Sequence, residues 1–227
     1  MIKKEILEGY ECNINGVSCS ASLNEFPTGT HKITQNDIPL TNLTFILNYT
    51  SITPLKCNEL FYESTATEII FETKVECLEP QYMFSTSKIL TKIDLNYLDI
   101  SKTQTIYKMF YRCYELTEIN GINDLNISMV TDMSYSFSEL SKIKYLDIGN
   151  WKTNKVTNYN YMFSYDTSLE FLNFTGLTIL DSMNPSTSNI FYYISGTTFK
   201  TCIIILDNIK ANKHSSLHGV YRIQPIN

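Results

Sequence analysis

The sequence repeats itself through its middle, and this repeat constrains the fold more than any other feature. Four phenylalanines mark it, Phe84, Phe110, Phe137 and Phe163, with steps of 26, 27 and 26 residues between them. A nearly constant period of this size indicates a solenoid, in which every repeat forms one coil. A single coil buries too little apolar surface to fold alone, so we expect neighbouring coils to stack and stabilise each other.

Apolar residues fall into columns when they are counted from each phenylalanine. The columns are Leu90, Leu116, Ile143 and Leu169 at six residues; Ile93, Ile119, Leu146 and Leu172 at nine; and Leu95, Gly121, Ile148 and Phe174 at eleven. This spacing is typical of the strand of a leucine-rich repeat. We therefore expect one short buried strand in every coil.

The array extends beyond the four regular repeats in a less regular form. Leu60–Phe61 precedes it and is followed by the strand-like run Glu68–Phe71. Ile190–Phe191 follows it and is succeeded by the run Cys202–Leu206. Terminal repeats are commonly atypical because one of their faces has no neighbour. The sequence thus predicts about six coils.

Residues typical of helix starts precede the Met-Phe segment of each repeat. Thr131-Asp132 and Thr157-Asn158 have side chains that accept the free amides of a first helical turn. Asn184-Pro185 has the form of a cap followed by proline at the first helical position. We expect each coil to consist of a strand, a loop and a short helix.

The repeat resembles the BspA-like leucine-rich repeats. The resemblance rests on Val130–Tyr135, Val156–Phe163 and Leu146–Ile148, and it covers about residues 80 to 180. Cys113 also lies where that family's repeat carries a cysteine. The resemblance implies an α/β leucine-rich-repeat solenoid used for binding, commonly on bacterial surfaces. It implies neither an enzyme nor fixed binding residues.

The fold class that these observations predict is α/β, a right-handed leucine-rich-repeat solenoid over residues 58–206. A small β-rich N-terminal domain is expected in residues 1–57, since Asn13–Val17 contains an Asn-Gly hairpin signal and Leu43–Leu47 is strand-like. That domain would cap the first coil or attach the solenoid to a partner, or do neither. Residues 207–227 are expected to cap the other end through a last strand near His218–Ile223.

Composition and charge exclude some classes of function. The net charge of −5 and the pI near 5.2 argue against nucleic-acid binding, which needs a basic face. No apolar run is long enough for a membrane span, so we expect no membrane insertion. Met1–Glu5 leads to Gly9 without a signal-peptide core, which favours a virion or the cytoplasm over Sec secretion.

Enzyme and metal chemistry find no support in the motifs. None of the usual nucleophile, phosphate-loop, dinucleotide or zinc-protease patterns occurs. The six cysteines contain no Cys-x-x-Cys pair, so free buried thiols are favoured, with a Cys12–Cys19 bridge as the alternative. His214 and His218 have a helical metal-ligand spacing, but Gly219 argues against a helix there. We expect no catalytic activity, no cofactor and no metal site.

The candidate partner-binding residues flank the buried strand position and are expected to face outward. They are Lys92, Asp94, Glu118, Asn120, Tyr145, Asp147, Phe171 and Asn173. The Asp and Asn positions would form a solvated polar ladder, a strip of acceptors for a glycan or peptide, or a site for a divalent ion at Asp94 or Asp147. Tyr145 and Phe171 would be adjacent exposed aromatics, and they are the preferred contact patch because aromatic residues dominate binding hot spots.

Two functions from different classes follow. The first is a non-enzymatic recognition or attachment module, displayed on a cell or phage surface, that binds a protein or glycan through the sheet face. The second is a structural virion component, such as a phage capsid or tail decoration protein. In that case the repeats would be a rigid spacer, and residues 1–57 would contact other virion proteins.

Overall fold

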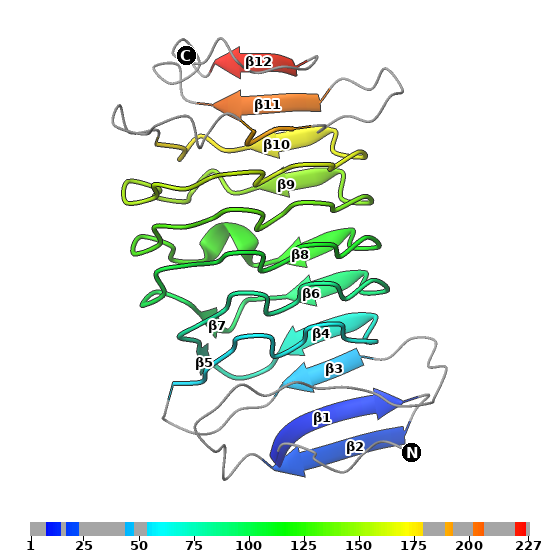
Figure 1. The fold of residues 1–227 in the computed structure, drawn as a ribbon. Coiled ribbons are helices and arrows are strands. Elements are labelled where there is room, and N and C mark those ends of the chain that lie inside the picture. Colours follow the sequence, from blue (N-terminus) through cyan, green and yellow to red (C-terminus); the bar gives the residue numbers. More distant parts are fainter. Residues whose placement is uncertain are drawn as a thin grey trace.

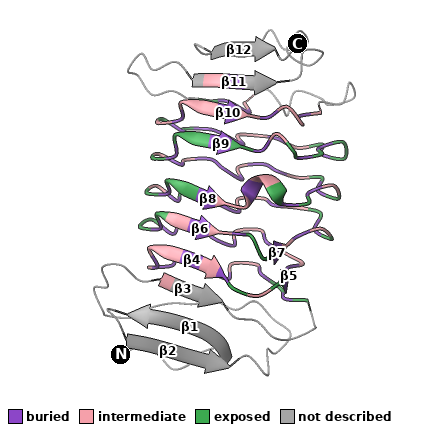
Figure 2. Ribbon diagram, turned by 180° about the vertical axis from the view of Figure 1, so that it is seen from behind, coloured by how far each residue is buried: buried purple, intermediate pink, exposed green. Residues whose placement is uncertain are grey.

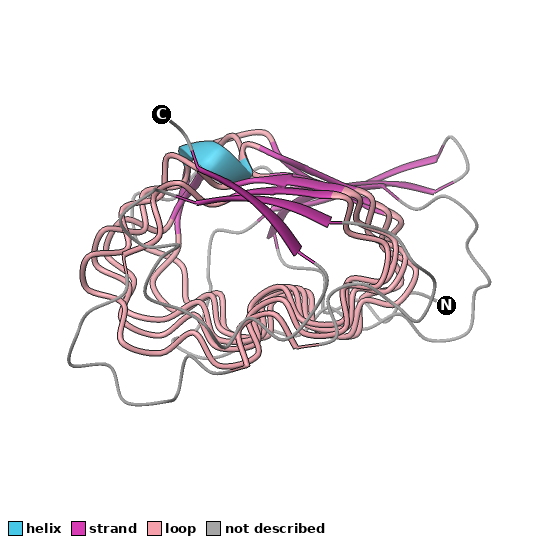
Figure 3. Ribbon diagram, turned by 90° about the horizontal axis from the view of Figure 1, so that it is seen from above, coloured by secondary structure: helices cyan, strands magenta, loops and turns pink. Residues whose placement is uncertain are grey.

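The computed structural model describes residues 8–14, 17–22, 44–47, 54–178, 189–192, 202–206 and 221–225. It shows a solenoid whose coils stack along one axis, with parallel strands on one side and turns on the others (Figures 1 and 3). About four complete turns lie in the continuous stretch 54–178. The prediction of a solenoid is confirmed, whereas the number of six coils is not.

Short parallel strands form the main face of the solenoid. One run consists of β3 (Thr44–Leu47), β4 (Glu68–Phe71), β6 (Lys92–Asp94) and β8 (Glu118–Asn120), and the other of β9 (Tyr145–Asp147), β10 (Phe171–Asn173), β11 (Cys202–Leu206) and β12 (Tyr221–Pro225). The middle residue of each three-residue strand is buried and its neighbours are not. This alternation follows from the two-residue period of a strand. A second face carries β5 (Val75–Glu76) paired with β7 (Leu98–Asp99).

The N-terminal strands continue the sheet of the solenoid. β1 (Glu8–Ile14) and β2 (Val17–Ser22) pair antiparallel with Ile14 opposite Val17, β1 pairs with β3, and β3 pairs in parallel with β4. The predicted hairpin and the predicted strand near residue 45 are therefore confirmed, as is a last strand, β12, beside β11. The domain boundary at residue 57 stays a prediction.

A column of stacked phenylalanine rings runs through the core. Its members are Phe61, Phe84, Phe110, Phe137, Phe163 and Phe191, with successive ring centroids 5.3–5.6 Å apart and ring planes within 16° of parallel. The ring spacing is close to the roughly 4.8 Å between paired strands, so successive rings follow the rise from one coil to the next. Phe61 and Phe191, which lie before and after the four regular repeats, also join the stack.

The prediction of a short helix in each coil is wrong. Among the described residues the only helix is the short 3-10 helix η1 (Ile122–Asp124). In the Met-Phe segments, amides alternate between partners: the N–H of Met109 donates to the carbonyl of Ile106 in its own coil, and the N–H of Phe110 donates to Ser136 in the next coil at 2.9 Å. An α-helix would direct every amide back along its own chain. In these segments, every second backbone amide instead donates to a carbonyl of the next coil.

The residues predicted as helix caps still accept the bonds expected of them. Asp132 Oδ1 accepts the backbone N–H of Ser134 at 2.9 Å, and Asn158 Oδ1 accepts that of Asn160 at 3.1 Å. These bonds begin turns rather than helices. Residues with positive φ then bend the chain, among them Tyr135 at 57°. The predicted cap at Asn184-Pro185 lies outside the described residues.

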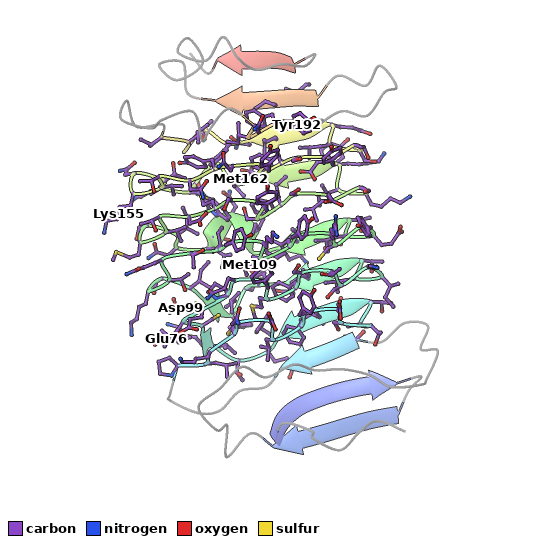
Figure 4. The ribbon with its side chains drawn as sticks, in the orientation of Figure 1. Glu76, Asp99, Met109, Lys155, Met162 and Tyr192 are labelled. Atoms are coloured by element: carbon purple, nitrogen blue, oxygen red, sulfur yellow. The ribbon has the colours of Figure 1, made fainter. Side chains whose placement is uncertain are left out.

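The interior also contains thiols and sulfur side chains. Cys57, Cys77 and Cys113 are buried and free, which confirms the favoured interpretation for these three. Burial raises the pKa of the Cys113 thiol to about 12, and the thiol donates to the carbonyl of Phe84 at 3.0 Å. Met109 and Met162 are fully buried, and both are labelled in Figure 4. Cys12 and Cys19 are opposite each other in the hairpin, and their bridge stays a prediction.

One carboxyl group lies in this core. Asp166 is 1% exposed, and its Oδ1 accepts the backbone N–H of Leu140 at 2.8 Å. Its Oδ2 is buried without a hydrogen-bond partner. Burial holds the pKa of this carboxyl well above its ordinary value. The hydrogen bond from the Leu140 amide lowers the pKa, but by less than burial raises it. The protonated form is therefore the one that the fold favours.

Replacing one ring of the phenylalanine column should weaken the whole stack. Phe110→Ala removes a fully buried ring between two neighbours, so we expect the free energy of unfolding to fall by about 3–5 kcal/mol. Urea denaturation followed by circular dichroism measures this. Tyr97→Ala, at a side chain that is 53% exposed, is the control and should change it by less than about 0.5 kcal/mol. Equal effects would contradict the role of the stack.

The buried carboxyl predicts a pH dependence with a definite sign. Because the folded-state pKa of Asp166 is raised, its contribution is most favourable below the unfolded pKa near 3.9 and is lost as pH rises through the folded pKa. Each unit by which the folded-state pKa is raised costs about 1.4 kcal/mol of stability once the carboxyl is ionised in the unfolded chain. Asp166→Asn cannot ionise, so it avoids this cost. We expect the variant to exceed the parent in thermal midpoint at pH 7 and to lose that advantage near pH 4. Glu115→Gln, at an exposed site, should shift neither.

Candidate ligand-binding cleft

The coil that begins at β8 is one residue longer than its neighbours, and the structure places the extra residue at Gly121. Leu95 and Ile148 are buried just after their strands, and in this coil Ile122 occupies the equivalent buried place. The alignment that puts Gly121 in this apolar column is therefore wrong. Gly121 has φ of +74°, and a Cβ there would lie 2.8 Å from Asn96 Oδ1 and 2.9 Å from its backbone N. Only glycine fits this bulge without strain.

The bulge coincides with an interruption of the sheet. β8 ends one run of paired strands and β9 begins the other, and no backbone hydrogen bond joins these two fully described strands. Figure 1 shows them farther apart than the strands on either side. The opposite face stays continuous, because the N–H of Phe110 donates to Ser136 at 2.9 Å and that of Phe137 to Met162 at 3.0 Å. The coils therefore separate on the sheet side alone.

A cleft of about 460 Å³ fills this separation. Its polar and aromatic lining comes from Asn120, Asn123, Asp124, Tyr145, Asp147 and Phe171. Ile119 and Leu146, the middle residues of β8 and β9, contribute apolar surface. Binding sites for small molecules commonly measure about 300–1,000 Å³. Figure 2 shows exposed positions along both strands that border the cleft.

Two hydrogen bonds fix one end of the cleft. The indole Nε1 of Trp151 donates to the carbonyl of Ile122 at 2.7 Å, and the backbone N–H of Asn150 donates to Asn123 Oδ1 at 2.9 Å. Trp151 is buried and packs against Phe137 with ring centroids 5.8 Å apart. These contacts join the two coils again beyond the strands, so the opening has defined limits.

The β8 wall presents backbone polar groups to the cleft. The N–H of Glu118 donates to the carbonyl of Thr91, and the carbonyl of Asn120 accepts the N–H of Leu95, so both residues direct their backbone groups toward β6. Successive residues of a strand direct these groups to opposite sides. The N–H and carbonyl of Ile119 therefore face β9, where no strand is paired with them.

The β9 wall does the same from the other side. The N–H of Ile148 donates to the carbonyl of Asn173 at 2.9 Å, which places β10 on that side of β9. By the same alternation, Tyr145 and Asp147 direct their backbone groups toward β8. The two walls thus carry donors and acceptors that the interrupted ladder leaves without a strand partner.

The eight residues predicted from the sequence divide between the cleft and the surrounding sheet. Asn120, Tyr145, Asp147 and Phe171 line the cleft. Tyr145 is 66% exposed and is paired in register with Phe171, so the two aromatics are adjacent as expected. Whether these residues bind a partner stays a prediction.

The other four predicted residues interact within the sheet face. Lys92 Nζ lies 3.4 Å from Glu118 Oε1, and Asp94 Oδ1 accepts the backbone N–H of Asn96. Asn173 Nδ2 donates to Asp147 Oδ1 at 3.0 Å, which is the bonding expected of a polar ladder. Among the residues that the structure describes, no group of three or more metal-binding side chains is found. His214 and His218 lie outside them.

Sequence reasoning missed Asn123, Asp124 and the cleft itself. The signal was present, because the step from Phe110 to Phe137 is one residue longer than the others and a glycine interrupts an apolar column. These two facts together indicate a bulge at the end of one strand. Neither shows that the ladder to the next coil would be lost.

A tyrosine-rich surface on the turn side was also missed. Lys108 Nζ lies 4.9–5.6 Å from the ring centroids of Tyr82, Tyr107, Tyr111 and Tyr135. Beside it, Arg112 Nε donates to both oxygens of Glu139 at 3.0–3.1 Å. Burial, with a smaller contribution from Glu139, raises the pKa of Tyr111 to about 12. These cation–π contacts join successive coils on this side.

Part of the chain is similar to a known protein family. Residues 78–183 match a family described as "Mycoplasma protein of unknown function, DUF285", which is related to the BspA-like repeat proteins. The matched residues contain the whole cleft and three complete strand-to-strand turns. No curated protein and no solved structure matches the chain. Within the described part of the chain, no helix has the length and apolar character to cross a membrane.

Hydrogen exchange should reveal the interrupted ladder. The amides of Ile119, Tyr145 and Asp147 face the cleft, so we expect them to exchange much faster than those of Leu95 and Ile148, which donate between coils at 2.9 Å. Two-dimensional NMR of the protein in deuterated buffer measures all five. Equal protection of the two groups would show that β8 and β9 are paired in solution.

Proposed function

We propose that this chain is a non-enzymatic recognition module of the BspA-like leucine-rich-repeat type, and that it binds a protein or glycan partner at the cleft between β8 and β9. The observation that carries the proposal is the loss of the strand ladder between β8 and β9, within the continuously described residues 54–178. It opens a cleft of about 460 Å³ on a face where β4, β6 and β8, and β9 and β10, are paired with their neighbours. The match of residues 78–183 supports the repeat type.

The chemistry of the cleft suits a polar partner with some apolar surface. Tyr145 and Phe171 offer aromatic contact area at a small cost in side-chain entropy. Asp124 and Asp147 offer carboxylate acceptors, and Asn120 offers an amide. The remaining partner contacts come from the backbone of the two walls. A small number of directional groups among apolar ones is typical of specific binding sites.

A structural role in a virion is the second proposal, and it has its own supporting observation. The N-terminal strands extend the same sheet, and the described phenylalanine rings from Phe61 to Phe191 form one continuous column. A solenoid stacked in this way is a stiff spacer. This role requires a defined assembly of the full chain or its docking on other chains, which light scattering after size-exclusion chromatography would detect.

Binding panels test the recognition proposal directly. The full chain is presented to an array of immobilised glycans and to a displayed library of random peptides. We expect a specific class of ligand to bind, and we expect Tyr145→Ala and Asp124→Ala each to weaken it by roughly tenfold or more, because both side chains line the cleft.

The controls match the tested residues in kind and exposure. Tyr97→Ala removes an exposed tyrosine, and Glu115→Ala removes an exposed carboxylate, and neither residue lines the cleft. Both should bind as the parent does. Absence of any ligand, or equal losses in the controls, would exclude the cleft as the recognition site.

A further inference from the structure

We infer that the occupant of the cleft is an extended polypeptide segment, which pairs with the open edges of β8 and β9 and completes the interrupted sheet. This inference rests on the proposed recognition function and names its partner class. It follows from the backbone of the two walls, from the size of the cleft and from its charge.

The backbone groups give the first argument. The N–H and carbonyl of Ile119 face the cleft from one wall, and those of Tyr145 and Asp147 face it from the other. Between β4 and β6, between β6 and β8, and between β9 and β10, the equivalent groups bond to the neighbouring strand. An extended chain carries the same groups in the same alternation, so one strand can bond to both walls at once. Sugar hydroxyls have no such fixed alternation.

The size of the cleft gives the second argument. Three residues of a strand occupy roughly 480 Å³, from a rise of about 3.3 Å per residue, a strand spacing of about 4.8 Å and a thickness of about 10 Å. The cleft measures about 460 Å³, and each of its walls is a three-residue strand. The cleft is therefore large enough to admit one short strand.

The charge of the cleft restricts the sequence of that segment. Asp124 and Asp147 both line it, and none of its lining residues is basic. The exposed ring of Tyr145 stands beside Asp147 on the same strand. A lysine or arginine of the bound segment would contact this ring and pair with a carboxylate. We therefore expect a neutral or basic segment rather than an acidic one.

The test uses a displayed library of random dodecapeptides and the same glycan array, applied to the full chain. We expect peptides with a central lysine or arginine to be enriched. Resynthesis of one such peptide with alternate backbone nitrogens methylated should reduce its affinity at least tenfold, because each methyl group removes a donor of the ladder while the side chains stay. Binding of the parent peptide should also slow hydrogen exchange at Ile119, Tyr145 and Asp147.

A variant with the cleft closed gives an independent control. Deletion of Gly121 restores the 26-residue step, so β8 and β9 should pair directly and peptide binding should be lost. Protection of the Tyr145 and Asp147 amides would verify the closure. If this variant does not fold, Tyr145→Ala, at a side chain that is 66% exposed, and the methylated peptides carry the test instead.

The outcomes separate the inference from the function on which it rests. Enrichment of peptides that depend on their backbone amides supports both. Binding of glycans that is lost in Tyr145→Ala, without peptide enrichment, overturns the peptide inference and leaves the recognition site in place. Peptides that bind equally well after methylation also overturn it. No ligand of either kind would overturn both.

Discussion

The structure depends on stacking between coils at a constant spacing. Each coil has few interactions of its own, with strands of two to four residues in the continuous stretch and turns that direct half of their amides to the next coil. The rings from Phe61 to Phe191 stack at 5.3–5.6 Å along the same axis. Because every coil must reach its neighbours on all sides, a change in the length of one coil has to be absorbed locally.

The cleft is the local response to such a change. The residue added at Gly121 is placed at the end of β8, while the phenylalanine side keeps its ladder through Ser136 and Met162. Trp151 and Asn123 join the coils again at the far end. The core thus remains closed and the sheet face opens. The one extra residue at Gly121 therefore leaves backbone groups without a strand partner beside Tyr145.

Much of this architecture follows from the sequence, because repetition shows which residues are equivalent. The solenoid, the strands at Glu68–Phe71 and Cys202–Leu206, and the outward aromatics Tyr145 and Phe171 were predictable from columns and period. The helix in each coil was not. Asp132 and Asn158 accept the same type of bond in a turn as in a helix cap, and only the competing amide bonds to the next coil decide between them. Prediction of the cleft also requires the hydrogen bonds between coils, because an aligned column of residues does not show whether two neighbouring strands are paired.

The bulge has an evolutionary consequence. In a solenoid, each coil contacts mainly its immediate neighbours. If the codon for Gly121 were lost and one codon were inserted at the end of another strand, the opening would therefore move along the solenoid axis. The surrounding sequence at each position differs, with Lys92 and Glu118 beside one pair of strands and Tyr145 and Phe171 beside another. Single-codon insertions and deletions would therefore change which side chains border the opening while the shared core is retained. Binding specificity among such proteins would then change because the cleft moves to a different pair of coils, rather than because residues inside one cleft are substituted.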